Sequence, residues 1–172
     1  MTPSIAVRLE SVLHGLRDAI IPAINPDEAL AVEQSGLIVA QLTMLLQQLP
    51  YADRYHRLCR DDARATAIAI GQDASGGPRS RSAAEALLAL LNDVDADEPH
   101  SSYLALAGGI SALTTAVCED ADPAWRAFVA RTVFEFSVRQ NRRERVWFKD
   151  SGFDPAPGEL PSLTEMCATK SR

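Results

Sequence analysis

A cluster of arginines near residue 140 is the part of the sequence best suited to chemistry. The stretch SVRQNRRERVWFKD, residues 137–150, holds five cations in a chain whose net charge is -6. Residues 126–149 hold seven cations and two anions, a net charge of +5, so the rest of the chain carries -11. Guanidinium groups gathered in this way either bind an anion such as a phosphate, a carboxylate or a nucleic acid, or lie in solvent at the end of a helix.

Helical periodicity divides this cluster into two sides. At about 100° per residue, Arg143 and Trp147 continue the apolar stripe of the segment, whereas Arg142, Arg145 and Lys149 fall on the opposite side. Interaction with the helix C-terminal dipole suffices to explain the outward row. Arg139 flanks the stripe one turn after Glu135, so we expect a pair between them. The predicted stripe comprises Trp125, Phe128, Val129, Thr132, Val133, Phe136 and Gln140.

Arg143 is the exception that the dipole does not explain. A guanidinium on the buried side of a helix must be paired or must open into a wet cleft, because an unpaired buried charge costs several kcal/mol. We therefore expect either a carboxylate partner or a ligand at Arg143.

A second set of cations lies between residues 54 and 64. Arg57 follows Asp53 by four positions and Arg64 follows Asp61 by three, so a self-neutralised helix surface is expected. If this helix neighbours the 123–149 helix, its cations and those near residue 140 converge on a phosphate or a carboxylate. The candidate ligand- or partner-binding residues are Arg143, Arg139, Trp147, Arg60, Arg64 and His56.

The spacing of the other reactive residues argues against several classes of site. No glutamate is followed three positions later by histidine, which excludes the di-iron carboxylate pattern of helical bundles. The three cysteines are widely spaced and form no Cys-x-x-Cys pair. A metal site would require His14, His56 and His100 to converge from different helices. We therefore expect no catalytic residue, no metal and no cofactor.

Composition places the chain among globular proteins. Its 172 residues, 47% hydrophobic and 23% charged, fit one domain with its own core. The sequence pI near 5.0 argues against a surface that binds nucleic acid throughout. No signal peptide and no long uncharged apolar run is found, so a soluble cytoplasmic protein with no membrane contact is expected.

The elements that would position these residues are all helices. Apolar residues recur at three- and four-residue steps, and no alternating strand pattern occurs, so an all-α single-domain bundle of about six helices is predicted. The second helix follows the N-cap Asn25 and is apolar on most sides, which indicates the most buried helix; Pro50 ends it. Residues 71–82 are predicted to be a flexible connection. The expected helices span about 5–21, 26–49, 51–70, 83–94, 101–119 and 123–149. The stripe expected to be buried on the helix over 101–119 comprises Tyr103, Leu106, Ala107, Ile110, Leu113, Thr114 and Val117.

The last 22 residues are predicted to form an irregular tail beyond a bundle of residues 1–150. Pro155, Pro157 and Pro161 oppose a long helix there. Phe153, Leu160 and Leu163 are the expected anchors, on the bundle or on a partner chain.

Four functions follow from these patterns. The leading hypothesis is a soluble non-catalytic helical bundle that acts through partner binding or self-association, as a homo-oligomer such as a homodimer. The alternative covers two functions, a small-molecule binding protein and an enzyme. Either would have an interhelical pocket bordered by arginines and suited to an acyl or phosphorylated anion. Nucleic-acid binding by the outward arginine row ranks third, because few aromatic residues lie between the cations.

Overall fold

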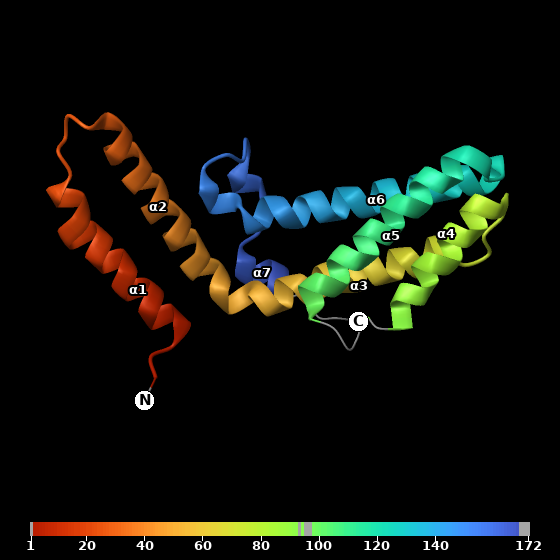
Figure 1. The fold of residues 1–172 in the computed structure, drawn as a ribbon, viewed down its shortest axis with the longest axis horizontal. Coiled ribbons are helices and arrows are strands. Elements are labelled where there is room, and N and C mark those ends of the chain that lie inside the picture. Colours follow the sequence, from red (N-terminus) through yellow and green to blue (C-terminus); the bar gives the residue numbers. More distant parts are fainter. Residues whose placement is uncertain (1, 93, 95–97, 169–172) are drawn as a thin grey trace. The chain divides into compact units, whose positions relative to one another are not determined.

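The computed structural model describes residues 2–92, 94 and 98–168, and every regular element in this part of the chain is a helix. The predicted all-α fold of about six helices is therefore confirmed (Figure 1). A π-helical turn at Leu16–Ile20 and a 3₁₀ turn at Ile21–Ala23 extend the first helix. The α-helices are α1 (Ile5–Gly15), α2 (Ala29–Gln48), α3 (Ala52–Gly71), α4 (Pro78–Ala89), α5 (Pro99–Asp120), α6 (Pro123–Trp147) and the short α7 (Leu163–Ala168).

The chain divides into two compact units, which are described separately. The terminal unit contains Met1–Ala52 and Arg145–Arg172, so both ends of the sequence belong to it. The central unit is the continuous segment Asp53–Glu144.

The central unit contains most of the buried apolar side chains. The stripe predicted for α5 is confirmed, because Leu106, Ile110, Leu113 and Val117 are all buried. α5 lies beside α4, and Gly109 allows a close approach: a Cβ there would stand 2.8 Å from the side chain of Leu87. Gly71, at the end of α3, allows a similar approach to α4, since a Cβ there would stand 2.9 Å from the side chain of Leu88. The rest of this core is Ala63, Ala67, Ile70, Ala84, Leu87, Val94, Ala121, Trp125, Val129 and Phe136.

The start of α4 corrects the prediction of a flexible connection over residues 71–82. α4 begins at Pro78, because the carboxylate of Asp120 accepts hydrogen bonds from the backbone N–H groups of Arg79 (2.9 Å) and Ser80 (3.0 Å). These donors would otherwise be unsatisfied at a helix start. Gly77 donates its N–H to the Asp120 carbonyl at 2.8 Å, and a Cβ on Gly77 would lie 2.3 Å from the Asp120 carboxylate. The connection is therefore held by the C-terminal end of α5.

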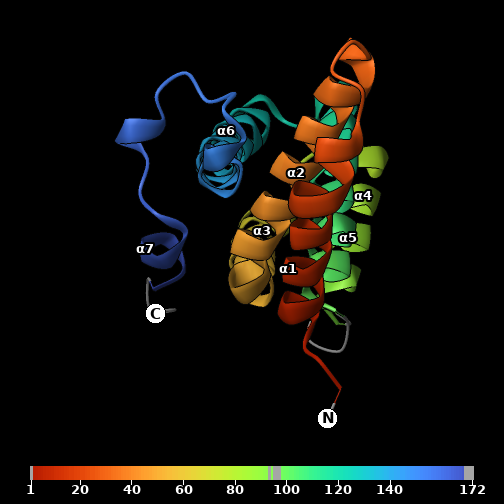
Figure 2. The ribbon, with the colours of Figure 1, turned by 90° about the vertical axis from the view of Figure 1, so that its left-hand side faces the viewer.

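The α1–α2 hairpin, residues 5–48, is the main element of the terminal unit. The two helices contact each other and run antiparallel (Figure 1 and Figure 2). The prediction that the second helix is the most buried one is wrong, since Ser35 and Gln48 are the only buried residues of α2. Within its unit α2 packs along α1 on one side and meets the end of α6 only near its own C-terminus, where Gln48 Nε2 donates to the Trp147 carbonyl at 2.8 Å. Its remaining apolar sides are exposed.

Two predicted helix boundaries also differ from the structure. The Asn25 side chain accepts the N–H of Asp27 at 3.1 Å and forms a turn, so α2 begins at Ala29 rather than after Asn25. Pro50 does not end the helical path, because Leu49–Tyr51 forms one 3₁₀ turn that leads directly into α3. A proline is tolerated in the first turn of a helix, where its missing N–H has no partner in any case.

The tail beyond α6 is tied to the terminal unit by hydrogen bonds. Arg145 Nε donates to Asp154 at 2.8 Å and Lys149 Nζ donates to the Leu160 carbonyl at 2.9 Å. Leu160 is buried as predicted, but Phe153 is 87% exposed and therefore does not anchor the tail within this chain. Arg145 and Lys149, assigned above to the solvent-facing row, hold the tail instead.

Two helical segments, Ala29–Gly71 and Pro99–Asp120, are long and apolar enough to cross a membrane by length and composition. The core helices of soluble proteins satisfy the same criterion, so these lengths are weak evidence for a membrane span.

Candidate functional site

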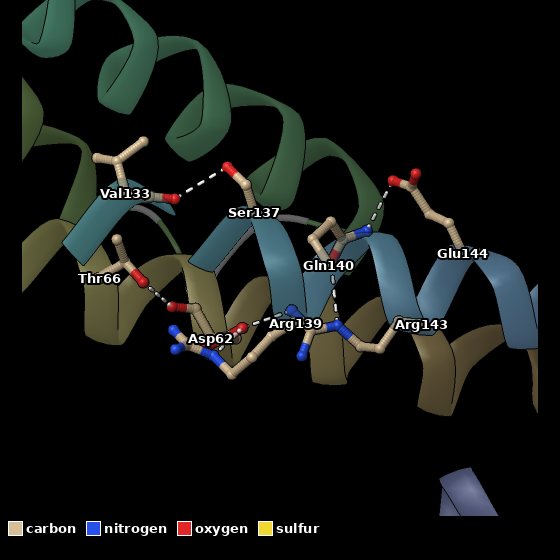
Figure 3. A network of polar contacts seen from close by, with 8 residues as sticks. All are labelled: Asp62, Thr66, Val133, Ser137, Arg139, Gln140, Arg143 and Glu144. Atoms are coloured by element: carbon tan, nitrogen blue, oxygen red, sulfur yellow. Dashed lines mark hydrogen bonds and ion pairs between the residues drawn. The ribbon is translucent and has the colours of Figure 1, made fainter. Parts of the chain in front are cut away.

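Asp62 organises the arginine cluster in the central unit. α3 places this aspartate between Cys59 and Thr66, two inward-facing residues, and α6 places Arg139 and Arg143 opposite it (Figure 3). Arg139 Nε lies 3.1 Å from both carboxylate oxygens of Asp62. Arg143 donates from Nη2 to the same carboxylate. The expected pair between Glu135 and Arg139 is replaced by this pairing between two helices.

Gln140 completes the surroundings of Arg143. Its Oε1 accepts from Arg143 Nε at 3.0 Å and its Nε2 donates to Glu144 at 3.0 Å (Figure 3). The side chains of Arg143 and Asp62 are only 16% and 18% exposed. The Asp62 network is defined here as Asp62, Arg139, Gln140, Arg143 and Glu144.

The electrostatic balance of the Asp62 network determines what it can do. Two guanidinium groups and two carboxylates sum to zero, and the donors of Arg143 already point at Asp62 and Gln140. An incoming phosphate would have to displace Asp62, so the network is built as a helix–helix connection.

A buried thiol and two phenols lie near this network. Burial raises the pKa of the Cys59 thiol, although Gln140 and Arg143 act in the opposite direction. Burial likewise raises the pKa of Tyr55 and of Tyr103. At neutral pH these groups are therefore protonated and neutral, and the thiol is a poor nucleophile.

The structure separates the other predicted site residues. Arg60 donates to the neighbouring Asp61 at 2.8 Å, and Arg64 is exposed, so neither joins Arg143 on a common anion. The prediction of a pair between Asp61 and Arg64 is replaced by the Arg60–Asp61 pair, whereas the predicted Asp53–Arg57 pair is confirmed at 2.8 Å. Trp147 belongs to the terminal unit.

His56 is paired with another histidine. Its ring lies with its centroid 4.6 Å from that of His100, and both residues belong to the central unit. Burial, followed by the charge of His100, lowers the pKa of His56. His14 belongs to the terminal unit. Across the described residues no group of three or more histidine, cysteine, aspartate or glutamate side chains could hold a metal ion.

The α1–α2 hairpin carries the feature that sequence reasoning missed. Nine of the fifteen large hydrophobic residues exposed in the described part of the chain lie between residues 5 and 45. Each leaves 45–70% of its surface uncovered. They are Ile5, Val7, Val12, Ile20, Leu30, Val32, Leu37, Ile38 and Leu45. Periodicity marks such residues as apolar but cannot show that no helix of the same unit covers them.

Two features of the Asp62 network, the position of Asp62 and the bond between Gln140 and Arg143, have only weak signals in the sequence. Asp62 lies three residues after Cys59 and four before Thr66, which places it near the inward side of α3. Gln140 had been placed on the α6 stripe, but its bond to Arg143 follows only from the rotamers that both side chains adopt.

Comparisons with known proteins add no relative: no family model matches the chain, and neither curated proteins nor solved structures give a significant match.

Proposed function

We propose that this protein is a non-catalytic helical protein that acts by binding a protein chain through the α1–α2 hairpin. The exposed aliphatic side chains of the hairpin carry this proposal. Contiguous apolar surface beyond a few hundred Å² is uncommon on soluble monomers and marks interaction sites. Covering a large aliphatic side chain fully is worth about 1.5–3 kcal/mol, so the half-exposed ones that a partner covers supply a substantial driving force for association.

The competing hypotheses have less support. Three of the four arginines expected to line an anion pocket donate to carboxylates: Arg60 to Asp61, and Arg139 and Arg143 to Asp62. Of the outward row meant for nucleic acid, Arg145 donates to Asp154 and Lys149 to a backbone carbonyl. Protein binding therefore ranks first, because its surface is uncovered while most cations of the other two hypotheses are engaged.

The stability of hairpin variants tests this proposal. If Leu30 and Leu37 serve a partner rather than the fold, Leu30→Gln and Leu37→Gln will each change the free energy of unfolding by less than about 0.5 kcal/mol in dilute protein. The core control Leu13→Ala, in the same hairpin, will cost about 2–5 kcal/mol. Urea denaturation measured over a dilution series separates the fold from any association.

Losses at Leu30 and Leu37 as large as that at Leu13 would contradict the proposal. Such losses would mean that these side chains are packed inside the folded chain in solution.

A further inference from the structure

We infer that the partner of the α1–α2 hairpin is the hairpin of a second copy of this chain, the two forming an antiparallel four-helix bundle. This inference rests on the proposed function and names its partner. A two-helix hairpin buries one stripe of each helix, whereas each helix of a four-helix bundle contacts two neighbours. Here α1 and α2 each have one full-length neighbour within their unit.

The apolar side chains gather on one face of the hairpin. Taking about 100° per residue, Ile5 and Val12 lie about 80–100° to one side of Leu13, the residue of α1 buried toward α2. Ile38 and Leu45 lie about 60–80° from the buried Ser35 in the same rotational sense. In an antiparallel pair of helices, residues that are displaced in the same rotational sense from the line of contact lie on the same face of the pair. This face, with Leu30 and Leu37 along the outer edge of α2, is called the seam face.

The seam face repeats every seven residues on both helices. Ile5 and Val12 are seven apart, and so are Ile38 and Leu45. A seven-residue apolar repeat is the pattern by which helices pack against one another in bundles and coiled coils.

The opposite face of the hairpin is polar. It includes Arg17, whose Nη2 donates to Thr43 Oγ1 at 3.0 Å, and the exposed side chains of Glu10 and Gln47. Val7 and Val32 lie on this side too. The hairpin is thus amphipathic across its two broad faces, and only one of them suits apolar docking.

The seam face carries little charge, which favours an identical partner; Arg8 is the charged side chain that lies beside Ile5 and Val12. In a two-fold dimer each residue meets the same patch on the other copy, so a charged patch would meet its own sign. Gln34 and Gln41, both exposed beside Ile38, are neutral and each carries a donor and an acceptor, so they can pair with their own copies. Residues 1–52 hold two arginines and five acidic side chains, a net charge of -3, which opposes docking on an anionic membrane.

The area of the seam face fits a dimer. Its six aliphatic residues are each exposed by about half or more and together present on the order of 600 Å² of surface. This area is at the upper end of the range for the largest apolar patch on a monomeric protein, about 300–600 Å². Two copies joined through it would bury on the order of 1,200 Å², the lower edge of specific interfaces.

Sedimentation velocity on the full chain tests the inference with a matched pair of variants. Val12 and Val7 share a residue type, a helix and an exposure of 51% and 52%, but lie on opposite faces. We expect a concentration-dependent dimer for the wild type. Val12→Glu should weaken its dissociation constant at least about tenfold, because a carboxylate would be buried at the seam. Val7→Glu should stay within about twofold, and circular dichroism confirms that both variants fold.

Three results would overturn the second copy as partner. The first is a wild type that sediments as a monomer at every concentration. The second is dissociation of the dimer by Val7→Glu as strong as that by Val12→Glu. The third is a monomeric chain that co-sediments with neutral lipid vesicles in a way that Val12→Glu abolishes. If the wild type is a monomer but the Leu30→Gln and Leu37→Gln variants keep full stability, the hairpin binds a different protein partner and the proposed function is retained. Destabilised glutamine variants would remove both proposals.

Discussion

Asp62 accepts hydrogen bonds from Arg139 and Arg143, and at the scale of single residues this explains how an arginine is kept on the inward side of α6. The guanidinium of Arg143 would be costly if left unpaired, and Asp62 supplies the opposite charge while Gln140 satisfies a further N–H. The cluster that first resembles an anion site is thereby neutralised within the unit that contains it.

Removing Asp62 should reveal this dependence. Asp62→Asn leaves Arg143 mostly buried without its carboxylate, so we expect the free energy of unfolding to fall by about 1.5–3 kcal/mol. Urea denaturation of the variant measures the change. The matched control is Asp53→Asn, which breaks the exposed Asp53–Arg57 pair and should leave the midpoint unaltered. Equal effects of the two substitutions would show that the Asp62 network contributes nothing special to stability.

At the scale of elements, the junction between α4 and α5 shows how one carboxylate fixes a helix start. Asp120 ends α5 and at the same time caps α4, which lies 40 residues earlier in the chain. The hydrogen bond from the side chain of Ser80, together with those from the backbone N–H groups of Arg79 and Ser80, lowers the pKa of this carboxyl group, as expected for a helix cap. Gly76 and Gly77 provide the space that the cap requires.

Two glycine-to-alanine substitutions should therefore act in opposite directions. Gly77→Ala forces a methyl group into the Asp120 carboxylate and should lower stability by about 1–3 kcal/mol. Gly108→Ala, in α5, meets no atom within 4 Å and should raise stability by about 0.5–1 kcal/mol, since alanine is the better helix former. Thermal unfolding followed by circular dichroism compares them. Stabilisation by Gly77→Ala would mean that Asp120 does not cap α4 in solution.

The helices themselves were largely predictable, and their partners were not. Periodicity placed the α5 stripe correctly, because Leu106, Ile110 and Leu113 recur at the helical step. The α4 start was missed because its cap comes from Asp120, a distant residue that no local pattern reveals. Arg143 was identified as an arginine that needs a partner, but Asp62 was not, since pairing between helices depends on their packing.

At the scale of the whole molecule, burial is divided unequally between the two units. The described residues of the terminal unit include five buried side chains: Leu13, Ser35, Gln48, Val146 and Leu160. The central unit holds the rest, including a continuous core over α3, α4, α5 and α6. Apolar burial is the main favourable contribution to folding, so local stability should differ accordingly.

Hydrogen exchange should report this difference. In dilute protein we expect amide protection in α3 and α5 to exceed that in α1 and α2 by at least about tenfold, because opening the hairpin exposes little that is not exposed already. Mass-spectrometric exchange on peptides from these helices measures it, with the Asp62→Asn variant as a control that lowers protection selectively in α3. Equal protection in all four helices would contradict the unequal distribution.

The mainly aliphatic character of the seam face has a consequence for how the protein should be handled. Attraction between aliphatic surfaces weakens on cooling, whereas attraction between opposite charges weakens with added salt. Contacts made by Ile5, Val12, Ile38 and Leu45 should therefore be sensitive to cold and nearly indifferent to sodium chloride. A preparation kept on ice would then contain more separated chains than the same preparation at room temperature.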